Sequence, residues 1–268
     1  MKRSPAVAGQ FYYEDPARLN QQVEQYINKK TGKENAVGIL VPHAGLIYSG
    51  AVAGAVYSSI SFPGTFIMLG PNHTGLGAQM SIVDAGEWEV PTGRIGIDGK
   101  LASRILQKAS GVTRDSQAHI FEHSLEVQLP FMTYISKEVK IVPLAIRSGS
   151  FDECMALADI IANAVQSVAY PVTILASSDM SHHLPDNTAR LKDKIAINKM
   201  LDIDSEGLYY SVMQERISMC GLLPAFIMLS ASRLLGAKTA HLVKYMTSGE
   251  VSGDYDDVVG YAGIILTR

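Results

Sequence analysis

The chain has 268 residues, of which 47% are hydrophobic and 18% charged, so it can bury a sizeable core as one large or two small domains. Its net charge of −3, with no run of like charge, argues against nucleic acid or an anionic membrane as a partner. Two cysteines are too few for a disulfide framework and favour a reducing compartment.

The N-terminal stretch "MKRSPAVAGQFYYEDP" contains no apolar segment long enough for a secretory signal. The apolar runs that follow are shorter than the ~20 residues that cross a bilayer. We therefore expect a cytoplasmic protein. A first helix is predicted to begin at Pro16, because Asp15 can cap it and proline suits its first turn.

Short apolar runs alternate with longer segments of helical periodicity along the rest of the chain. This alternation is typical of a mainly parallel sheet with helices on both faces. Strands are predicted at 37–41, 65–69, 140–146, 172–176, 241–247 and 258–267, and helices at 16–28, 49–60, 101–108, 151–168, 187–200, 205–212 and 222–235. Glycine and Pro-Thr-Gly interrupt residues 80–98, which predicts an antiparallel hairpin. Without a linker or repeat, residues 1–268 are expected to form a single α/β domain.

Histidines follow several of the predicted strands. His43 comes in "PHAG" after the strand at 37–41, and His73 comes in "GPNHTG" after the strand at 65–69. In open α/β sheets, ligands bind beyond the carboxyl ends of the strands. Each histidine alone could simply satisfy a turn by hydrogen bonding. Two in matching positions favour a pair of metal ligands at one edge of the sheet.

Asp179, His182 and His183 follow the strand at 172–176, in "SSDMSHH". Asp179 could orient an imidazole, and His182 could serve as a general acid and base. The alternative is a helix-capping residue beside exposed histidines. Because adjacent side chains rarely point the same way, at most one of the two histidines is expected to act in the site.

The stretch "HIFEHSLEVQLPFM" contains His119-x-x-Glu122-His123, which matches the inverted zinc-peptidase pattern. That chemistry needs both histidines on one helical face. Ser124 instead looks like a cap for a helix that begins at Leu125, which leaves His119 outside the helix, and Pro130 limits that helix. We therefore interpret Glu122 and His123 as residues that line the same cleft.

The two cysteines differ in context. Cys220 precedes a predicted helix, whose N-terminus would lower the pKa of the thiol and favour metal binding, although a buried inert thiol is the alternative. Cys154 lies within a predicted amphipathic helix, so we expect it to be an inert thiol in the core. Phosphate-loop, dinucleotide-binding and serine-hydrolase motifs are absent from the sequence.

Seven stretches together resemble the Memo family, in that family's order and across essentially the whole chain. They are "RSPAVAGQFY", "VPHAGLIYSG", "LGPNHTG", "EHSLEVQLPF", "SSDMSHH", "MCG" and "SGDYDDVVGYAGIIL". The family is similar in fold to the class III extradiol (LigB-type) ring-cleaving dioxygenases, which use non-haem iron. The resemblance implies a three-layer α/β/α sandwich with a mainly parallel mixed sheet.

The same resemblance implies that His43, His73 and Cys220 are the metal ligands and that Asp179 and His182 lie in the cleft, with His182 in the place of the dioxygenase acid/base histidine. Related oxygen-activating enzymes use two histidines and a carboxylate. Here "MCG" offers a thiolate, which is softer and itself oxidisable, so ring cleavage does not follow from the fold.

The leading hypothesis is a metal-binding protein with a mononuclear iron or copper site and redox or dioxygenase-like chemistry on an unknown small molecule. His182 would exchange protons, and Asp179, Glu122 and His123 would line or support the cleft. The alternatives are a non-catalytic module that holds a peptide in the cleft, since Memo-like proteins are associated with phosphopeptide binding, and a zinc-dependent hydrolase. Exposed helix faces would allow an oligomer.

Overall fold

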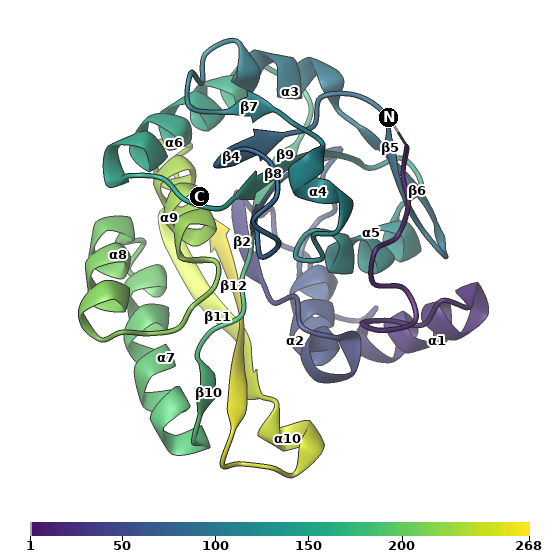
Figure 1. The fold of residues 1–268 in the computed structure, drawn as a ribbon, viewed down its shortest axis with the longest axis vertical. Coiled ribbons are helices and arrows are strands. Elements are labelled where there is room, and N and C mark those ends of the chain that lie inside the picture. Colours follow the sequence, from purple (N-terminus) through teal and green to yellow (C-terminus); the bar gives the residue numbers. More distant parts are fainter. Residues whose placement is uncertain (1) are drawn as a thin grey trace.

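Four apolar strands lie side by side at the centre of a twelve-stranded sheet in the computed structural model, which describes residues 2–268 (Figure 1). Their order across the sheet is β8 (Lys140–Ile146), β3 (Thr65–Pro71), β9 (Val172–Ser177) and β2 (Gly38–Val41), and all neighbours are parallel. Nearly all of their side chains are buried, as continuous apolar runs predict for strands that are covered on both faces.

Antiparallel strands extend this centre on one side. β12 (Val258–Thr267) pairs with β2, and both β11 (Thr239–Thr247) and β10 (His182–Leu184) pair with β12. The result is the expected mixed sheet with a mainly parallel centre.

The other side of the sheet contains the hairpin that the sequence predicts, but the hairpin is shorter than expected. β5 (Glu87–Val90) and β6 (Gly93–Ile97) form the antiparallel pair, and β1 (Lys2–Arg3) adds to β5. β4 (Met80–Ile82) lies outside the hairpin, because it pairs with β8 and with β7 (Thr113–Arg114).

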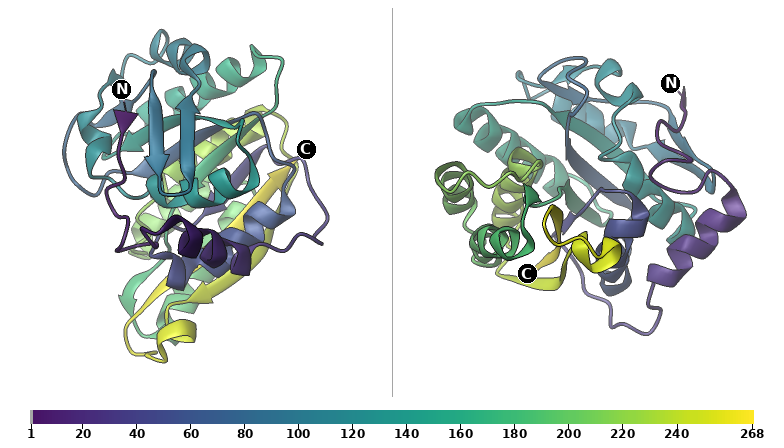
Figure 2. Two further views of the ribbon diagram at one scale, coloured as in Figure 1. Left: turned by 90° about the vertical axis from the view of Figure 1, so that its right-hand side faces the viewer. Right: turned by 60° about the horizontal axis from the view of Figure 1, so that its bottom comes forward.

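Helices cover both faces of the sheet and give the predicted α/β/α layers (Figure 2). Side chains alternate between the faces along each strand, so Ile39 packs into one apolar core and its neighbour Leu40 into the other. The helices of the first face are α1 (Pro16–Tyr26), α2 (Leu46–Ser59) and α5 (Leu129–Ile135). Those of the second are α3 (Gly99–Leu106), α6 (Phe151–Gln166), α7 (Asp186–Leu201), α8 (Ser205–Gln214) and α9 (Leu222–Leu234).

The prediction that a helix begins at Leu125 is wrong. A 3₁₀ turn, η1 (Glu126–Gln128), comes first, and α5 begins only at Leu129. Ser124 does not cap a helix, because its hydroxyl donates to the Pro71 carbonyl at 2.9 Å. Pro130 lies in the first turn of α5, where a missing N–H costs nothing, and so it starts the helix rather than limiting it.

Two further short helices were not predicted, α4 (Gln117–Ile120) and α10 (Gly249–Ser252). Within residues 2–268, no helix has the length and apolar character that crossing a membrane requires.

Small residues let α2 approach the end of α1. A Cβ on Gly54 would lie 2.4 Å from the Tyr26 carbonyl oxygen, and a Cβ on Gly50 would lie 2.4 Å from the Tyr26 ring. We predict that Gly54→Ala lowers the free energy of unfolding by about 1–2 kcal/mol, because the cost of overpacking against backbone exceeds the gain in helix propensity. Urea unfolding measures this change. Gly96→Ala in β6 is the control, since a Cβ there meets nothing within 4 Å. Equal stability of the two variants would contradict the prediction.

Candidate metal centre

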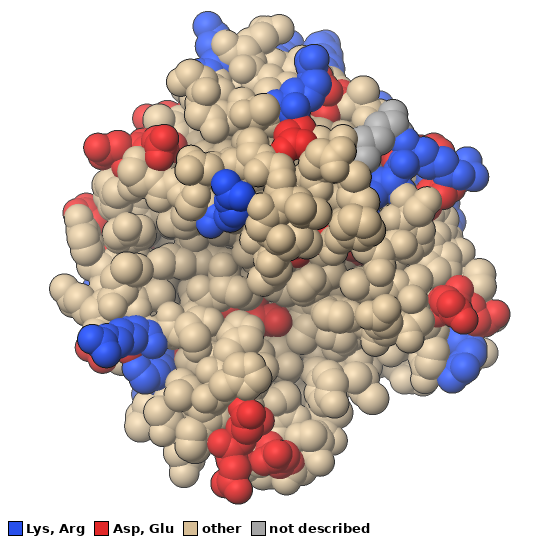
Figure 3. Space-filling model, in the orientation of Figure 1, with Lys and Arg blue, Asp and Glu red and all other residues tan. Residues whose placement is uncertain are grey.

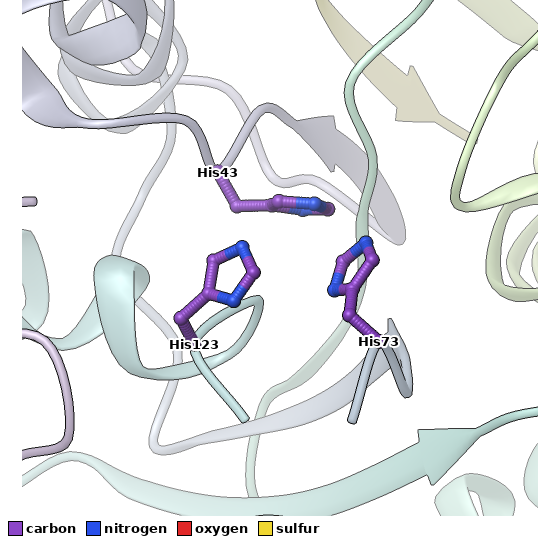
Figure 4. Close-up of side chains that lie close together, drawn as sticks. All are labelled: His43, His73 and His123. Atoms are coloured by element: carbon purple, nitrogen blue, oxygen red, sulfur yellow. The ribbon is translucent and has the colours of Figure 1, made fainter. Parts of the chain in front are cut away.

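Three histidines from separate segments lie together beyond the carboxyl ends of the central strands. His43 follows β2, His73 follows β3, and His123 comes from the loop between α4 and η1. Each offers a ring nitrogen within 4.8 Å of the others, and Figure 4 shows the rings turned toward a common space. The sequence predicts the places of His43 and His73 at the sheet edge, whereas it predicts His123 only as a lining residue.

Hydrogen bonds determine which nitrogen of His43 is available. The Ser177 hydroxyl donates to the Ser124 carbonyl at 2.7 Å, so its oxygen is left as an acceptor. His43 Nδ1 lies 2.9 Å from that oxygen and must carry the proton. Gln128 Nε2 donates to the same oxygen at 3.1 Å. His43 Nε2 therefore keeps a free lone pair, as a metal ligand requires.

His43 is also held neutral. It is 1% exposed, and burial is the main reason that its pKa lies well below the usual value, with added repulsion from His123 and His73. A neutral imidazole is the form that binds metal, so the site is prepared for a cation without first losing a proton.

Glu122 orients the ring of His73 and holds the backbone of His123. Its Oε1 accepts from His73 Nδ1 at 3.0 Å and lies 3.5 Å from His123 Nδ1, while the backbone N–H groups of His123 and Ser124 each donate to Oε1 at 2.9 Å. The backbone N–H of His73 donates to the other carboxylate oxygen. A carboxylate behind a histidine ring fixes the tautomer and makes the free nitrogen a better ligand.

The ionised form of Glu122 is strongly favoured. Burial opposes ionisation, but the hydrogen bond and charge of His73, together with the Ser124 amide, lower the pKa of the carboxyl to about 2. The carboxylate therefore supplies one negative charge next to the three imidazoles, which partly balances the charge of a bound cation.

Cys220 and Asp179 border the same space. Cys220 Sγ lies 3.4 Å from His43 Nε2 and accepts from the Asp179 backbone N–H at 3.3 Å. The Asp179 carboxylate accepts from the backbone N–H groups of His43 at 2.8 Å and Ala44 at 3.3 Å, and so it holds the loop after β2. These contacts bring three of the predicted site residues together: His43, Asp179 and Cys220.

The prediction that the nearby helix lowers the pKa of the Cys220 thiol is wrong for the metal-free protein. Burial raises that pKa, and the Asp179 charge raises it further, despite the nearby start of α9. A cation bound at His43 Nε2 would displace the thiol proton, because a coordinating thiol is deprotonated. Cys154 is fully buried in α6, and burial raises its pKa to about 11, as expected for a core thiol.

His182 and His183 differ in their surroundings. His182 Nδ1 lies 2.8 Å from the Ser218 carbonyl and must donate to it, which leaves Nε2 as an acceptor. The side chain of His183 is 80% exposed, and its Nδ1 lies 3.1 Å from an oxygen of the exposed Asp257. His182 thus has the fixed tautomer that an acid/base group needs, and His183 lies in solvent.

His119 is not part of the centre. It lies in α4, fully buried, with its ring 5.5 Å from that of Trp88 in an edge-on arrangement. Glu122 and His123 lie beyond the end of that helix, so the residues of the zinc-peptidase pattern share no helical face. The geometry does not support zinc-peptidase chemistry.

The donor set fits a transition metal. Imidazole suits iron, copper and zinc, and a thiolate adds preference for softer ions. Within the described residues, the group of three ligands that lie close enough together is His43, His73 and His123, whereas Cys220 is outside this group and lies 3.4 Å from His43 Nε2. Ser177 and Gln128 also support the centre, because Ser177 holds the His43 ring and Gln128 donates to Ser177. The sequence did not predict these roles, since a serine at a strand end and a glutamine near a helix are too common to indicate one.

On the face of the molecule in Figure 3, one cluster of acidic side chains lies at the bottom of the view, over the loop near α10, and other acidic side chains are scattered over the rest of this face. On this face the described residues form no continuous patch of lysine and arginine.

Comparisons with known proteins agree in naming one family. The chain matches the family model described as "Memo-like protein" over residues 3–265. A MEMO1 family protein of Aquifex aeolicus is 40% identical over 266 residues, which cover 98% of each chain. Another, of Pyrobaculum arsenaticum, is 39% identical over 278 residues and 99% of each chain. A third, of Methanosarcina barkeri, is 40% identical over 266 residues, 98% of this chain and 99% of the relative.

We predict that Glu122→Gln weakens metal binding by about 10–100-fold, because an amide carries no charge and has one acceptor oxygen where the carboxylate uses two to hold the His73 ring and the nearby backbone. Titration of the metal-free protein with Co²⁺, followed by its visible absorption, measures the affinity. Glu89→Gln, in β5 and outside the centre, is the control. Unchanged affinity in Glu122→Gln would contradict the supporting role of the carboxylate.

A separate prediction concerns pH. Burial, with the charge of Arg3, lowers the pKa of His119 from 6.5 to about 4. Below pH 6.5 His119 binds a proton in the unfolded chain but stays neutral in the folded chain until the pH approaches 4. The free energy of unfolding therefore falls as the solution is acidified. From pH 7 to pH 4.5 this residue alone should lower it by about 2 kcal/mol. Urea unfolding of His119→Leu at both pH values should show a smaller fall than the parent, while the exposed-residue control His183→Gln should match the parent. Equal falls in parent and His119→Leu would exclude this effect.

Proposed function

Because this chain belongs to the Memo family, we propose that it binds one iron or copper ion at His43 and His73 and uses it in a redox or oxygen-dependent reaction. The observation that carries this proposal is the group of three imidazoles whose ring nitrogens lie within 4.8 Å of one another, on loops held by buried carboxylates. The names of the relatives give a family and no reaction, so the activity rests on the site.

We assign Cys220 as the third ligand. Its sulfur lies 3.4 Å from His43 Nε2, and a thiolate beside two imidazoles is a donor set that suits copper and iron. The bound ion would supply the redox chemistry. His123 lies 4.8 Å, ring centre to ring centre, from His73 and, with His43, completes the group of three histidines.

The chain's own residues supply proton transfer and positioning. His182 Nε2 is free to take a proton from a substrate and return it, because Nδ1 is committed to Ser218. Asp179 holds the backbone of His43 in place, and Glu122 holds His73 and His123. A cytoplasmic small molecule that can be oxidised is the substrate class that we propose.

The His123 position also favours a second candidate, a zinc-dependent hydrolase. Three histidines with an open fourth position are the ligands of a catalytic zinc site, where bound water becomes a nucleophile. In that case the thiol of Cys220 would not bind the ion. The remaining alternative is a module without catalysis that holds a peptide in the same cleft.

The test is elemental analysis of protein purified without oxygen and without added metal, beside His43→Ala, Cys220→Ala and His123→Ala. We predict near-stoichiometric iron or copper in the parent protein, loss of the metal in His43→Ala and Cys220→Ala, and a smaller loss in His123→Ala. Cys154→Ala is the control for a general effect of removing a thiol, because Cys154 is buried in α6.

Other results would select the alternatives. Zinc that is lost in His123→Ala and kept in Cys220→Ala would support the hydrolase. A parent protein that binds no metal, even after anaerobic loading, would overturn the metal proposal and leave the peptide-binding module.

A further inference from the structure

The N-terminal strap, residues 3–12, contacts two of the three segments that carry the histidines. At its start, Arg3 is almost completely buried. Arg3 Nε donates to the His119 carbonyl at 2.6 Å, and one terminal nitrogen donates to the Glu122 carbonyl at 2.7 Å. Its guanidinium also lies 4.5 Å from the centre of the Trp88 ring. One side chain thus holds the backbone at both ends of the turn that leads into His123.

Glu126 joins the rest of the strap to the same segment. Its side chain is fully buried and lies 2.7 Å from Arg3. It also accepts from the backbone N–H groups of Ala6 at 2.8 Å and Val7 at 3.0 Å, and from the hydroxyl of Tyr12. Because a buried carboxylate needs all its partners, the strap and the segment at 119–126 must be in place together.

Phe11 brings the strap to the centre itself. Its ring lies 4.6 Å from the ring of His123, centre to centre. Its carbonyl accepts from the backbone N–H of Leu46 at 2.7 Å, just after the loop of His43. The strap therefore connects the segment of His43 to the segment of His123, which the sheet itself does not join.

We propose that the N-terminal strap sets the geometry of the metal centre, with Arg3 and Glu126 as positioning residues that act through Glu122 and His123. This inference rests on the proposed metal binding. A purely structural role would lower stability and leave the centre intact in molecules that remain folded. A positioning role lowers metal affinity in the folded protein.

The test compares Co²⁺ affinity, followed by visible absorption, in the parent and in Arg3→Met. We expect a loss of about tenfold, comparable to the loss of other groups that orient metal ligands. Ile161→Ala is the matched control, because it empties core on the opposite face of the sheet and destabilises without touching the strap. Its affinity should stay within about threefold of the parent at a temperature where both proteins are folded.

A double-mutant cycle separates positioning from a general effect. Arg3→Met should cost little further affinity in a Glu122→Ala background, because the group through which it acts has already been removed. Independent losses that multiply in the double variant would overturn the proposal. If Arg3→Met does not fold, Arg3→Lys takes its place, since lysine keeps the charge near Glu126 but cannot make both carbonyl contacts.

Amide hydrogen exchange of the metal-free proteins gives an answer that does not depend on metal. In Arg3→Lys we expect exchange in residues 119–127 to be at least about tenfold faster, with the strands β2 and β3 unchanged. If the parent binds no Co²⁺, the proposed function fails. The exchange rates still show whether the N-terminal strap holds residues 119–127 in place. Unchanged exchange in residues 119–127 would overturn the positioning role even where metal binds.

Discussion

The insertion of β9 between β2 and β3 is the constraint on which the site depends. The register pairs Val41 with Ser177 and Leu69 with Ala176, so the three strands end at nearly the same level. The residues that follow β2 and β3 are therefore directed into one space, and Ser177, the last residue of β9, reaches the ring of His43. Parallel pairing makes the site possible, because it gathers at one edge side chains that are far apart in the chain.

Loops beyond the strands cannot use sheet pairing, and buried carboxylates replace it here. Each of three acidic side chains accepts backbone N–H groups from a loop at the centre or from the strap, so the loop's donors are satisfied and its path is defined. The three are Asp179, Glu122 and Glu126, which hold the segments at 43–44, at 73 with 123–124, and at 6–7. Of the three, Glu122 lies directly beside the imidazole of His73, so its negative charge would also partly balance that of a bound cation.

Long apolar runs predict the strands of this fold well, since β8 and β12 begin and end where the sequence indicates. The start of α5 could not be predicted, because the Ser124 hydroxyl can cap a local helix or bond a distant carbonyl, and only the folded chain presents Pro71 to it. The same limit applies at the site. Strand ends indicate His43 and His73, whereas the place of His123 beside them depends on a carboxylate that accepts from both segments.

The strand order also bears on how the protein is made. All three histidines of the group lie within residues 43–123, but β9, which separates and aligns β2 and β3, begins only at Val172. During synthesis, the three histidines leave the ribosome before β9, the strand that lies between β2 and β3. Non-local pairing of this kind forms late. The three imidazoles can therefore take up their observed arrangement only after most of the polypeptide has been synthesised.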